Sequence, residues 1–475
     1  MVMNLIDLFG KQLKEWTDYA LQFMSTKDVV IPHMEWEVAA AAALDISFSE
    51  MRFVLSLILA IPLSFVVRAI KNRSARYVYS TACGLILIIY PFGRGVLQIT
   101  FPSVTTYLAM LLIPKRCGTI AWLTVFPYLV WLQIVTASGM ACNTGGVDFV
   151  GGIMVLTLKL ISMASSRQDS FSKKPLTQYQ AAHKIDRMPG PLSFFSFVFA
   201  QSNLLVGPTI EYAEYEAFMR LEGVWSTGSG KLGAPLGLSN AFSLIAQGLG
   251  FMGLHIVLIS KLGWGIHGSF WFKDPAYTRL PLLVRLGSQV VCGFAHQVKY
   301  YFLWKLSESA SILSGFDYEG VGDEGVPRWG RCTNVRFLGM WLADSSRIVP
   351  QHWNIRTGIF LRHYVYERLV GHSGKASFIH VLITQLITAF WHGVYPGYII
   401  FFVGIRKSWP WWLFKVAWTD IAVCYMAMAF VILDGKKSLE VHADVAFLPH
   451  IIMIGICALS PLVPRIKRAS KDKTQ

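Results

Sequence analysis

Charged residues are scarce in this sequence. They make up 15% of its 475 residues, and only 28 residues are Asp or Glu, whereas soluble domains carry about 25% charged residues. So little charge cannot cover the surface of a soluble protein of this length. The 54% content of hydrophobic residues also excludes a disordered chain. The composition therefore predicts a membrane protein with several spanning helices.

Several catalytic and metal-binding motifs are also missing. The sequence has no Cys-x-x-Cys pair, no His-Glu-x-x-His, no Gly-x-Ser-x-Gly and no His with Asp five positions later;. The segment 228–231 (Gly-Ser-Gly-Lys) is not a phosphate loop, because Trp225 and Leu232 stand where Gly and Ser or Thr are required;. We expect the seven cysteines to be small buried hydrophobic residues, and we expect no disulfide framework, bound metal or bound cofactor.

Long apolar runs recur along the chain. A spanning helix needs about 20 apolar residues, and such runs lie at about 52–70, 77–93, 96–114, 119–138, 149–165, 191–207, 240–260, 282–312, 376–404, 411–433 and 445–464. The predicted fold class is all-α, a polytopic membrane protein with roughly eleven transmembrane helices plus interfacial helices. Because we find no internal repeat or low-complexity linker, we expect residues 1–475 to form a single membrane-embedded domain. Residues 1–50 are expected to form an interfacial N-terminal segment, since 1–25 mix charged and apolar residues at helical spacing, unlike a signal peptide.

The net charge of +15 predicts the orientation of the chain. Basic residues cluster after the first, third and fifth apolar runs and in the tail 465–475, which places these loops in the cytosol by the positive-inside rule. In a membrane protein such a surplus indicates cytosolic loops and contact with anionic lipids rather than with nucleic acid, and an anionic co-substrate is a further possibility. The last five residues, Lys-Asp-Lys-Thr-Gln, resemble a dilysine retrieval signal. They predict the endoplasmic reticulum membrane and a cytosolic C-terminus.

Ionisable groups within apolar runs are candidates for function, because burying them in a membrane is unfavourable. His392 is the leading candidate. Gly393 and Gly397 permit close approach of a substrate or backbone, and Pro396 is expected to kink the helix;. A histidine ordinarily titrates near neutral pH and suits general-base catalysis. The alternative is a packed, hydrogen-bonded helix histidine.

Asn354 is the second candidate. It precedes a stretch in which Arg362, Tyr366 and Leu369 stand at helical spacing, which predicts an interfacial helix. An asparagine amide can donate to a carbonyl oxygen that becomes negative in a transition state. The alternative role for Asn354 is that of a helix cap.

The motifs around these two residues resemble the membrane-bound O-acyltransferase family. The first is Trp353-Asn354-Ile355 with 362–369 (Arg-His-Tyr-Val-Tyr-Glu-Arg-Leu), and the second is 391–398 (Trp-His-Gly-Val-Tyr-Pro-Gly-Tyr). Supporting stretches lie at 52–65, 154–162, 207–212, 299–315 and 329–335. The resemblance covers about residues 50–465. Within the family it is strongest to the lysophospholipid acyltransferases, and most of all to the plant-type lysophosphatidylcholine acyltransferases.

The resemblance implies that the chain transfers a fatty acyl group from acyl-CoA, as co-substrate, to the free hydroxyl of a lysophospholipid, with lysophosphatidylcholine as the expected acceptor. His392 and Asn354 would take the places of the catalytic residues, where a cytosolic acyl-CoA tunnel meets an opening to the lipid. Further substrate-binding residues are expected among Trp353, Trp391, Tyr300, Lys299, Glu308, Arg356 and Arg362. The three basic residues would contact a head group or phosphate, or else only extend to the membrane interface. Glu308 would orient His392 or pair with a basic residue.

Two other functions stay open at this point. A member of the same family can acylate another acceptor, such as lysophosphatidylethanolamine, lysophosphatidylserine, a sterol, diacylglycerol or a protein serine. A non-enzymatic lipid transporter or scramblase fits the composition as well, but it predicts internal repeats, and we find none. No oligomeric state is predicted.

Overall fold

Helices account for most of the chain in the computed structural model. The structure describes residues 31–43, 46–136, 149–200, 202–228, 231–261, 272, 274–345, 348–371, 374, 377–404, 412–433 and 435–452. Of the expected interfacial N-terminal segment 1–50, the structure describes 31–43 and 46–50, which include the helix Glu35–Ala43, and the interfacial location stays a prediction. The basic tail 465–475 lies outside the described residues. The extent of the single domain, 1–475, stays a prediction.

The α-helices of the first half of the described chain run from residue 35 to residue 261. These are α2 (Glu35–Ala43), α3 (Phe48–Val66), α4 (Arg73–Phe92), α5 (Thr100–Leu112), α6 (Cys117–Thr136), α8 (Val150–Asp169), α9 (Gln178–His183), α10 (Pro191–Val198), α11 (Tyr212–Arg220) and α12 (Leu238–Lys261). A 3₁₀ helix, Gly93–Ile99, joins α4 to α5. Gly93 ends α4 with a φ of 51°, which a residue with a side chain rarely adopts.

The second half alternates long and short elements. It contains α13 (Pro275–Thr278), α14 (Leu282–Ser314), the strands β1 (Tyr318–Val321) and β2 (Pro327–Trp329), α15 (Phe337–Trp341), α16 (Ile355–Phe360), a π-helix (Leu361–Tyr366), α17 (Glu367–Val370), α18 (Phe378–His392), α19 (Pro396–Gly404), α20 (Trp412–Ile432) and α21 (Gly435–Ala443). The two strands pair antiparallel, with Tyr318 opposite Trp329. The expected all-α fold is confirmed, with this small hairpin as its sheet.

Five segments of the described chain are long and apolar enough to cross a membrane. They are Phe48–Ala69, Arg73–Leu112, Pro114–Thr136, Val150–Asp169 and Leu238–Ile259, and Phe378–His392 and Thr419–Ala429 are shorter apolar helices. The number of spans therefore stays a prediction. The expected span at 191–207 is wrong, because α10 ends at Val198 and a helix of this length is far shorter than the hydrocarbon core.

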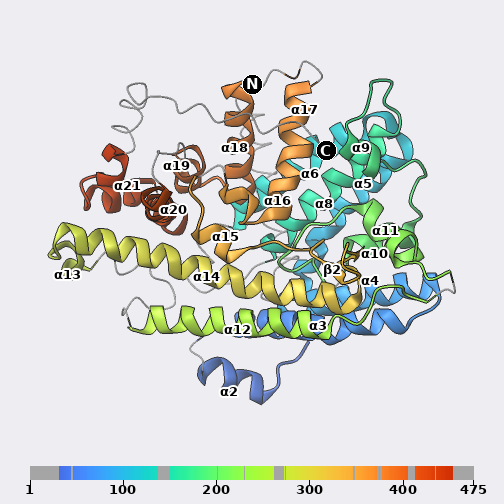
Figure 1. The fold of residues 1–475 in the computed structure, drawn as a ribbon, viewed down its shortest axis with the longest axis horizontal. Helices are drawn as coiled ribbons and strands as arrows, with labels where there is room; N and C mark the ends of the chain where they lie inside the picture. The colour runs from blue at the N-terminus through green and yellow to red at the C-terminus, as the bar shows by residue number, and fades with distance from the viewer. Residues whose placement is uncertain are drawn as a thin grey trace, which may run out of the picture.

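Two groups of helices cross each other in Figure 1. The helices α3, α12 and α14 run across the lower half of the view, and α14 packs against both of the others. The helices α17 and α18 stand upright above them, and α18 contacts the π-helix that leads into α17. Gly293 lets α14 approach α20, since a Cβ there would lie 2.4 Å from the Cys424 carbonyl oxygen. Further along α14, Trp304 packs on Trp353 and Glu308 accepts the N–H of Asn334, so α14 contacts the short elements that follow the hairpin.

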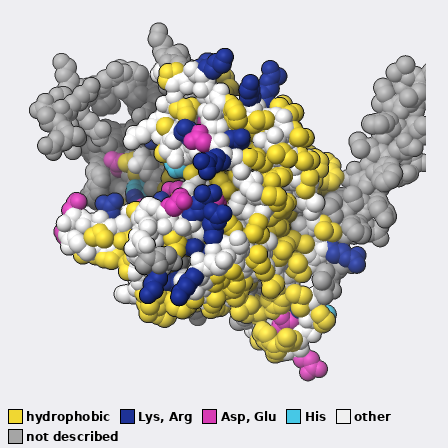
Figure 2. Space-filling view, turned by 90° about the vertical axis from the view of Figure 1, so that its right-hand side faces the viewer, with side chains coloured by type: hydrophobic (Ala, Val, Ile, Leu, Met, Phe, Trp, Pro, Cys, Tyr) yellow, Lys and Arg dark blue, Asp and Glu magenta, His cyan; other side chains and the backbone are white. Residues whose placement is uncertain are grey.

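The outer surface is consistent with a membrane environment. Figure 2 shows one face on which hydrophobic side chains form a broad surface beside a band of Lys and Arg. Large apolar side chains such as Leu112, Leu123 and Phe242 are at least 64% exposed. Exposed apolar surface of this extent requires a lipid or protein partner. The expected class, a multi-pass membrane protein, follows from these helices and this surface.

Basic side chains inside this helical body bind backbone oxygens. Lys159 of α8 is fully buried and donates to Phe197 O at 2.6 Å and Val198 O at 3.3 Å, so it caps the C-terminus of α10. Arg68 donates to the carbonyls of Ala234 and Pro235. Part of the basic surplus therefore stabilises the fold from within.

Candidate active site

Asn354 occupies the N-cap position of α16, but its side chain makes no capping hydrogen bond. Its backbone lies in the left-handed region, with φ 48° and ψ 49°, whereas capping side chains ordinarily extend from the β region. Another asparagine caps the helix instead. Asn334 Oδ1 accepts the backbone N–H of Arg356 at 3.1 Å. The helix predicted after Asn354 is confirmed as α16, the π-helix and α17.

Asn334 connects this helix start to the segment before α15. Its carbonyl oxygen accepts the N–H of Ile355 at 2.9 Å, and Val335 pairs with Trp353 as an isolated β-bridge. Its Nδ2 donates to Asn354 Oδ1 at 3.3 Å. Asn334 is only 1% exposed. Thus the side chain of Asn354 is held by a residue twenty positions earlier.

Glu308 of α14 holds this connection by hydrogen bonds to its backbone. Its Oε1 accepts the backbone N–H groups of Asn334 (2.7 Å) and Val335 (3.2 Å). Its Oε2 pairs with Lys305 at 2.7 Å, and the Lys305 ammonium also donates to Val335 O at 2.9 Å. Glu308 therefore pairs with a basic residue, which is one of the two roles considered for it, and it holds the backbone that carries Asn334.

Aromatic rings form a wall beside this network. The ring of Trp353 lies 4.9 Å from that of Trp304, 5.5 Å from Tyr301 and 5.8 Å from Tyr300. All three partners belong to α14, so α14 supplies one face of the wall. Edge-to-face packing of such rings adds to the free energy gained by burying their area. Of the expected substrate-binding residues, Trp353 and Tyr300 lie next to each other here.

His392 is the last residue of α18, and its C-cap, Gly393, has a φ of 145°. The helix therefore breaks immediately after His392 and resumes as α19 at Pro396. The imidazole is partly exposed and faces α19, with its ring centroid 5.0 Å from Phe402 and 5.5 Å from Tyr398. The kink expected in the 376–404 run is confirmed as this break.

Trp391 fixes the end of α18 to two neighbouring helices. Its indole Nε1 donates to Met154 O of α8 at 2.9 Å, and its carbonyl oxygen accepts Gln133 Nε2 of α6 at 2.7 Å. Both Trp391 and Gln133 are buried. The hydrogen bonds of Trp391 therefore set the position of the adjacent His392.

The basic candidates differ in their surroundings. Arg356 is largely buried and donates to Thr209 O at 3.0 Å, with Glu214 at 3.5 Å. The side chain of Arg362 is 71% exposed and pairs with Glu367 at 2.9 Å. Lys299 is partly exposed on α14. Arg356 is therefore held by contacts within the protein, while the side chains of Arg362 and Lys299 remain accessible from outside.

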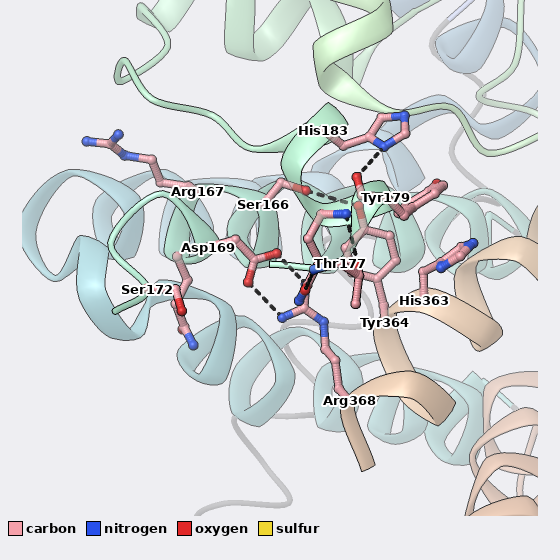
Figure 3. Close-up of polar contacts among 12 residues, drawn as sticks. Ser166, Arg167, Asp169, Ser172, Thr177, Tyr179, His183, His363, Tyr364 and Arg368 are labelled. Carbon is pink, nitrogen blue, oxygen red and sulfur yellow. Dashed lines mark hydrogen bonds and ion pairs between the residues drawn. The ribbon is translucent and has the colours of Figure 1, made fainter. Parts of the chain in front are cut away.

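A second polar cluster lies where α8, α9 and the π-helix meet (Figure 3). Arg368 forms a two-bond ion pair with Asp169, at 2.7 and 3.0 Å. The ring of Tyr179 stacks on His363 with centroids 3.6 Å apart. Tyr179 donates to Glu211 at 2.8 Å, and burial together with this carboxylate raises the pKa of Tyr179. Through Tyr179, the cluster joins α9 to the π-helix and to Glu211. π-Helices often lie near functional sites.

The described contacts form two groups of predicted site residues. One group surrounds Asn354 and contains Trp353, Tyr300, Glu308 and Arg356; the other contains His392 and Trp391. Trp353 and Trp391, one from each group, belong to the same hydrophobic core cluster.

Sequence reasoning missed Asn334, Lys305 and Gln133. The first two lie in stretches that carried the family resemblance, and the spacing of Lys305 and Glu308 by three positions in a helix was a usable signal. Gln133 lies in an apolar run, where a polar side chain is itself a signal. Within the described ranges no group of three or more His, Cys, Asp or Glu residues could hold a metal ion.

The comparison with known families identifies the class. The model of the membrane-bound O-acyltransferase family matches residues 75–405. The chain belongs to this family, and it is an acyltransferase. The expected family is thereby confirmed.

Known relatives are similar over most of the chain. Lysophospholipid acyltransferase 1 of Arabidopsis thaliana is 31% identical over 89% of this chain and 96% of its own length. Lysophospholipid acyltransferase 2 of the same plant is 32% identical over the same shares. The human membrane-bound glycerophospholipid O-acyltransferase 2 is 25% identical over 82% of this chain and 79% of its own length.

Proposed function

We propose that this protein transfers a fatty acyl chain from acyl-CoA to the free hydroxyl of a lysophospholipid, with lysophosphatidylcholine as the expected acceptor. The observation that carries the proposal is the match to two plant lysophospholipid acyltransferases over 96% of their length. The product is a diacyl phospholipid, and the reaction would serve phospholipid remodelling. Both substrates are amphiphiles, so a site inside the membrane accepts their chains without moving them into water.

The proposed chemistry uses His392 and Asn354. His392 accepts the proton of the lysophospholipid hydroxyl as that oxygen attacks the thioester carbonyl carbon. The Asn354 amide donates to the carbonyl oxygen as it becomes negative. The carbon–sulfur bond then breaks, the proton passes to the sulfur of coenzyme A, and the new ester stays in the bilayer. The mechanism requires neither a covalent acyl-enzyme nor a metal.

The decisive experiment measures acyl transfer by the purified protein in lipid nanodiscs. Labelled oleoyl-CoA is offered with lysophosphatidylcholine, lysophosphatidylethanolamine, lysophosphatidylserine, diacylglycerol and a sterol. We expect a lysophospholipid product, and we expect His392→Ala to abolish it. His380→Ala is the matched control, because His380 lies at the opposite end of the same helix, where its ring bonds to Ser377.

Each outcome bears on a different part of the proposal. Transfer only to diacylglycerol or sterol would replace the acceptor class. Full transfer by a folded His392→Ala variant would remove His392 from the chemistry. Lipid movement between leaflets without acyl transfer would favour a transporter.

The cellular location is part of the same proposal. We propose that the protein resides in the endoplasmic reticulum with its C-terminus in the cytosol, on the support of the basic tail and its two lysines, Lys471 and Lys473. Replacing both lysines with alanine should redistribute the protein along the secretory pathway. An unchanged location would contradict the retrieval signal.

A further inference from the structure

The hydrogen bonds of Asn334 determine which way its amide points. A backbone N–H can only donate, so the atom that faces the N–H of Arg356 must be the amide oxygen;. The amide nitrogen is then the atom that faces Asn354. No rotation of the Asn334 side chain satisfies Arg356 and presents an oxygen to Asn354 at the same time.

The orientation of Asn334 also determines the orientation of the Asn354 amide. Because Asn334 presents N–H groups, Asn354 must present its oxygen to them, as it does at 3.3 Å. The two N–H groups of Asn354 are then directed away from Asn334. Asn354 makes no capping bond to its own helix, so nothing in the cap competes for this orientation. Asn354 is also partly exposed, whereas Asn334 is buried.

We infer that Asn334 is a positioning residue, whose hydrogen bond turns the amide of Asn354 so that an N–H, rather than the oxygen, faces the acyl carbonyl. This inference rests on the proposed function. An amide turned the other way would place a lone pair against an oxygen that gains negative charge, which removes the stabilisation and adds repulsion. Loss of a single oxyanion donor lowers kcat by about 10²–10³-fold.

The support for Asn334 extends to α14. Glu308 accepts the backbone N–H of Asn334, and Ile355 donates to its carbonyl oxygen. Backbone and side chain of Asn334 are therefore fixed from both sides. A rigid amide of this kind can orient its neighbour without being rearranged during the reaction.

The isosteric variant Asn334→Asp tests the inference directly. The new carboxylate still accepts the N–H of Arg356 and keeps the shape of the side chain, but it presents an oxygen to Asn354. The Asn354 amide must turn its N–H groups toward that oxygen and away from the substrate. We expect kcat to fall by about 10²-fold with little change in KM for acyl-CoA.

Asn203→Asp is the matched control. Asn203 is as buried as Asn334, and its side-chain oxygen accepts from Lys159 at 3.4 Å; neither residue belongs to the two groups of candidate site residues. The same exchange there should leave kcat unchanged. Thermal unfolding of each purified variant reports whether it is folded.

A double-variant cycle separates positioning from a merely structural role. If Asn334 acts through Asn354, then Asn334→Asp in an Asn354→Ala background should lower kcat by less than about twofold, since the oriented amide is already gone. Additive losses would overturn the inference. If Asn334→Asp does not fold, Asn334→Ala in the same cycle gives the same test, with non-additive losses supporting the inference and additive losses refuting it.

The two proposals fail in distinguishable ways. Absence of acyl transfer by the wild-type protein, or full transfer by His392→Ala, refutes the proposed function. Acyl transfer that depends on His392 and Asn354, but that proceeds at a wild-type kcat in Asn334→Asp, refutes only the orientation of Asn354 by Asn334.

Discussion

The Lys305–Glu308 ion pair should be a main support of the fold beneath the candidate site. Their side chains are 6% and 4% exposed, and the charged atoms lie 2.7 Å apart. Lys305→Met leaves the carboxylate buried with only two backbone N–H groups. Removing one partner of a buried pair destabilises a protein by about 3–5 kcal/mol.

This loss of unfolding free energy can be expressed as a change in the melting temperature, Tm. The entropy of unfolding scales with length and is roughly 1 kcal/mol per kelvin for a chain of this size. We therefore expect Lys305→Met to lower Tm by about 3–5 °C. Lys305→Met combined with Glu308→Gln should recover part of that loss, because the glutamine oxygen still accepts the two N–H groups and no charge is left unpaired.

The assay is thermal unfolding of the purified variants in one detergent, followed by tryptophan fluorescence. Lys436→Met is the matched control, since Lys436 and Glu440 form an exposed pair at 4.0 Å and such pairs contribute about 0–1 kcal/mol. A Lys305→Met variant as stable as wild type would refute the reasoning. So would a double variant less stable than Lys305→Met alone.

Three further predictions follow from local geometry. Gly397→Ala should lower Tm and acyl transfer, because the new Cβ would lie 2.0 Å from Ala429 O and overpacking costs about 1–3 kcal/mol. Gly250→Ala is the control and should lower neither, because no atom lies within 4 Å of its new Cβ. Equal effects of the two substitutions would contradict the prediction. Burial raises the pKa of Asp317 to about 7, above its unfolded value, so its stabilising contribution is complete at low pH and is lost as pH rises through 7. The Tm of the wild type should accordingly fall more between pH 5 and pH 8 than that of Asp317→Asn, and parallel curves would be evidence against it. Arg368→Lys loses one of two bonds to Asp169 and should speed hydrogen exchange in α17 by a few-fold with less than about 1 kcal/mol lost; unchanged exchange would rule this out.

The sequence predicted those features that depend on local pattern. Composition indicated the membrane class, helical spacing of Arg362, Tyr366 and Leu369 predicted the helix after Asn354, and Pro396 predicted a kink in the 376–404 run. Each of these signals lies within a few residues of the structure that it specifies.

Features that depend on distant partners were not predicted. The side chain that caps α16 is Asn334, which belongs to another segment. From its identity alone, Asn354 was the natural candidate for this cap, but its left-handed backbone is not the conformation from which side chains ordinarily cap a helix;. The run 191–207 is apolar enough for a span, but the chain turns after Val198, where buried Lys159 binds the last carbonyls of α10. An apolar run cannot distinguish burial in protein from burial in lipid.

Trp391 holds one side of His392 by hydrogen bonds, and α19 packs against the other side. Hydrogen bonds to α6 and α8 hold the end of α18, whereas the imidazole meets α19 through the rings of Tyr398 and Phe402. α19 is held as well, because Gly397 donates its N–H to Leu433 O at 3.1 Å. The imidazole would therefore keep its position when substrates of different size bind beside it.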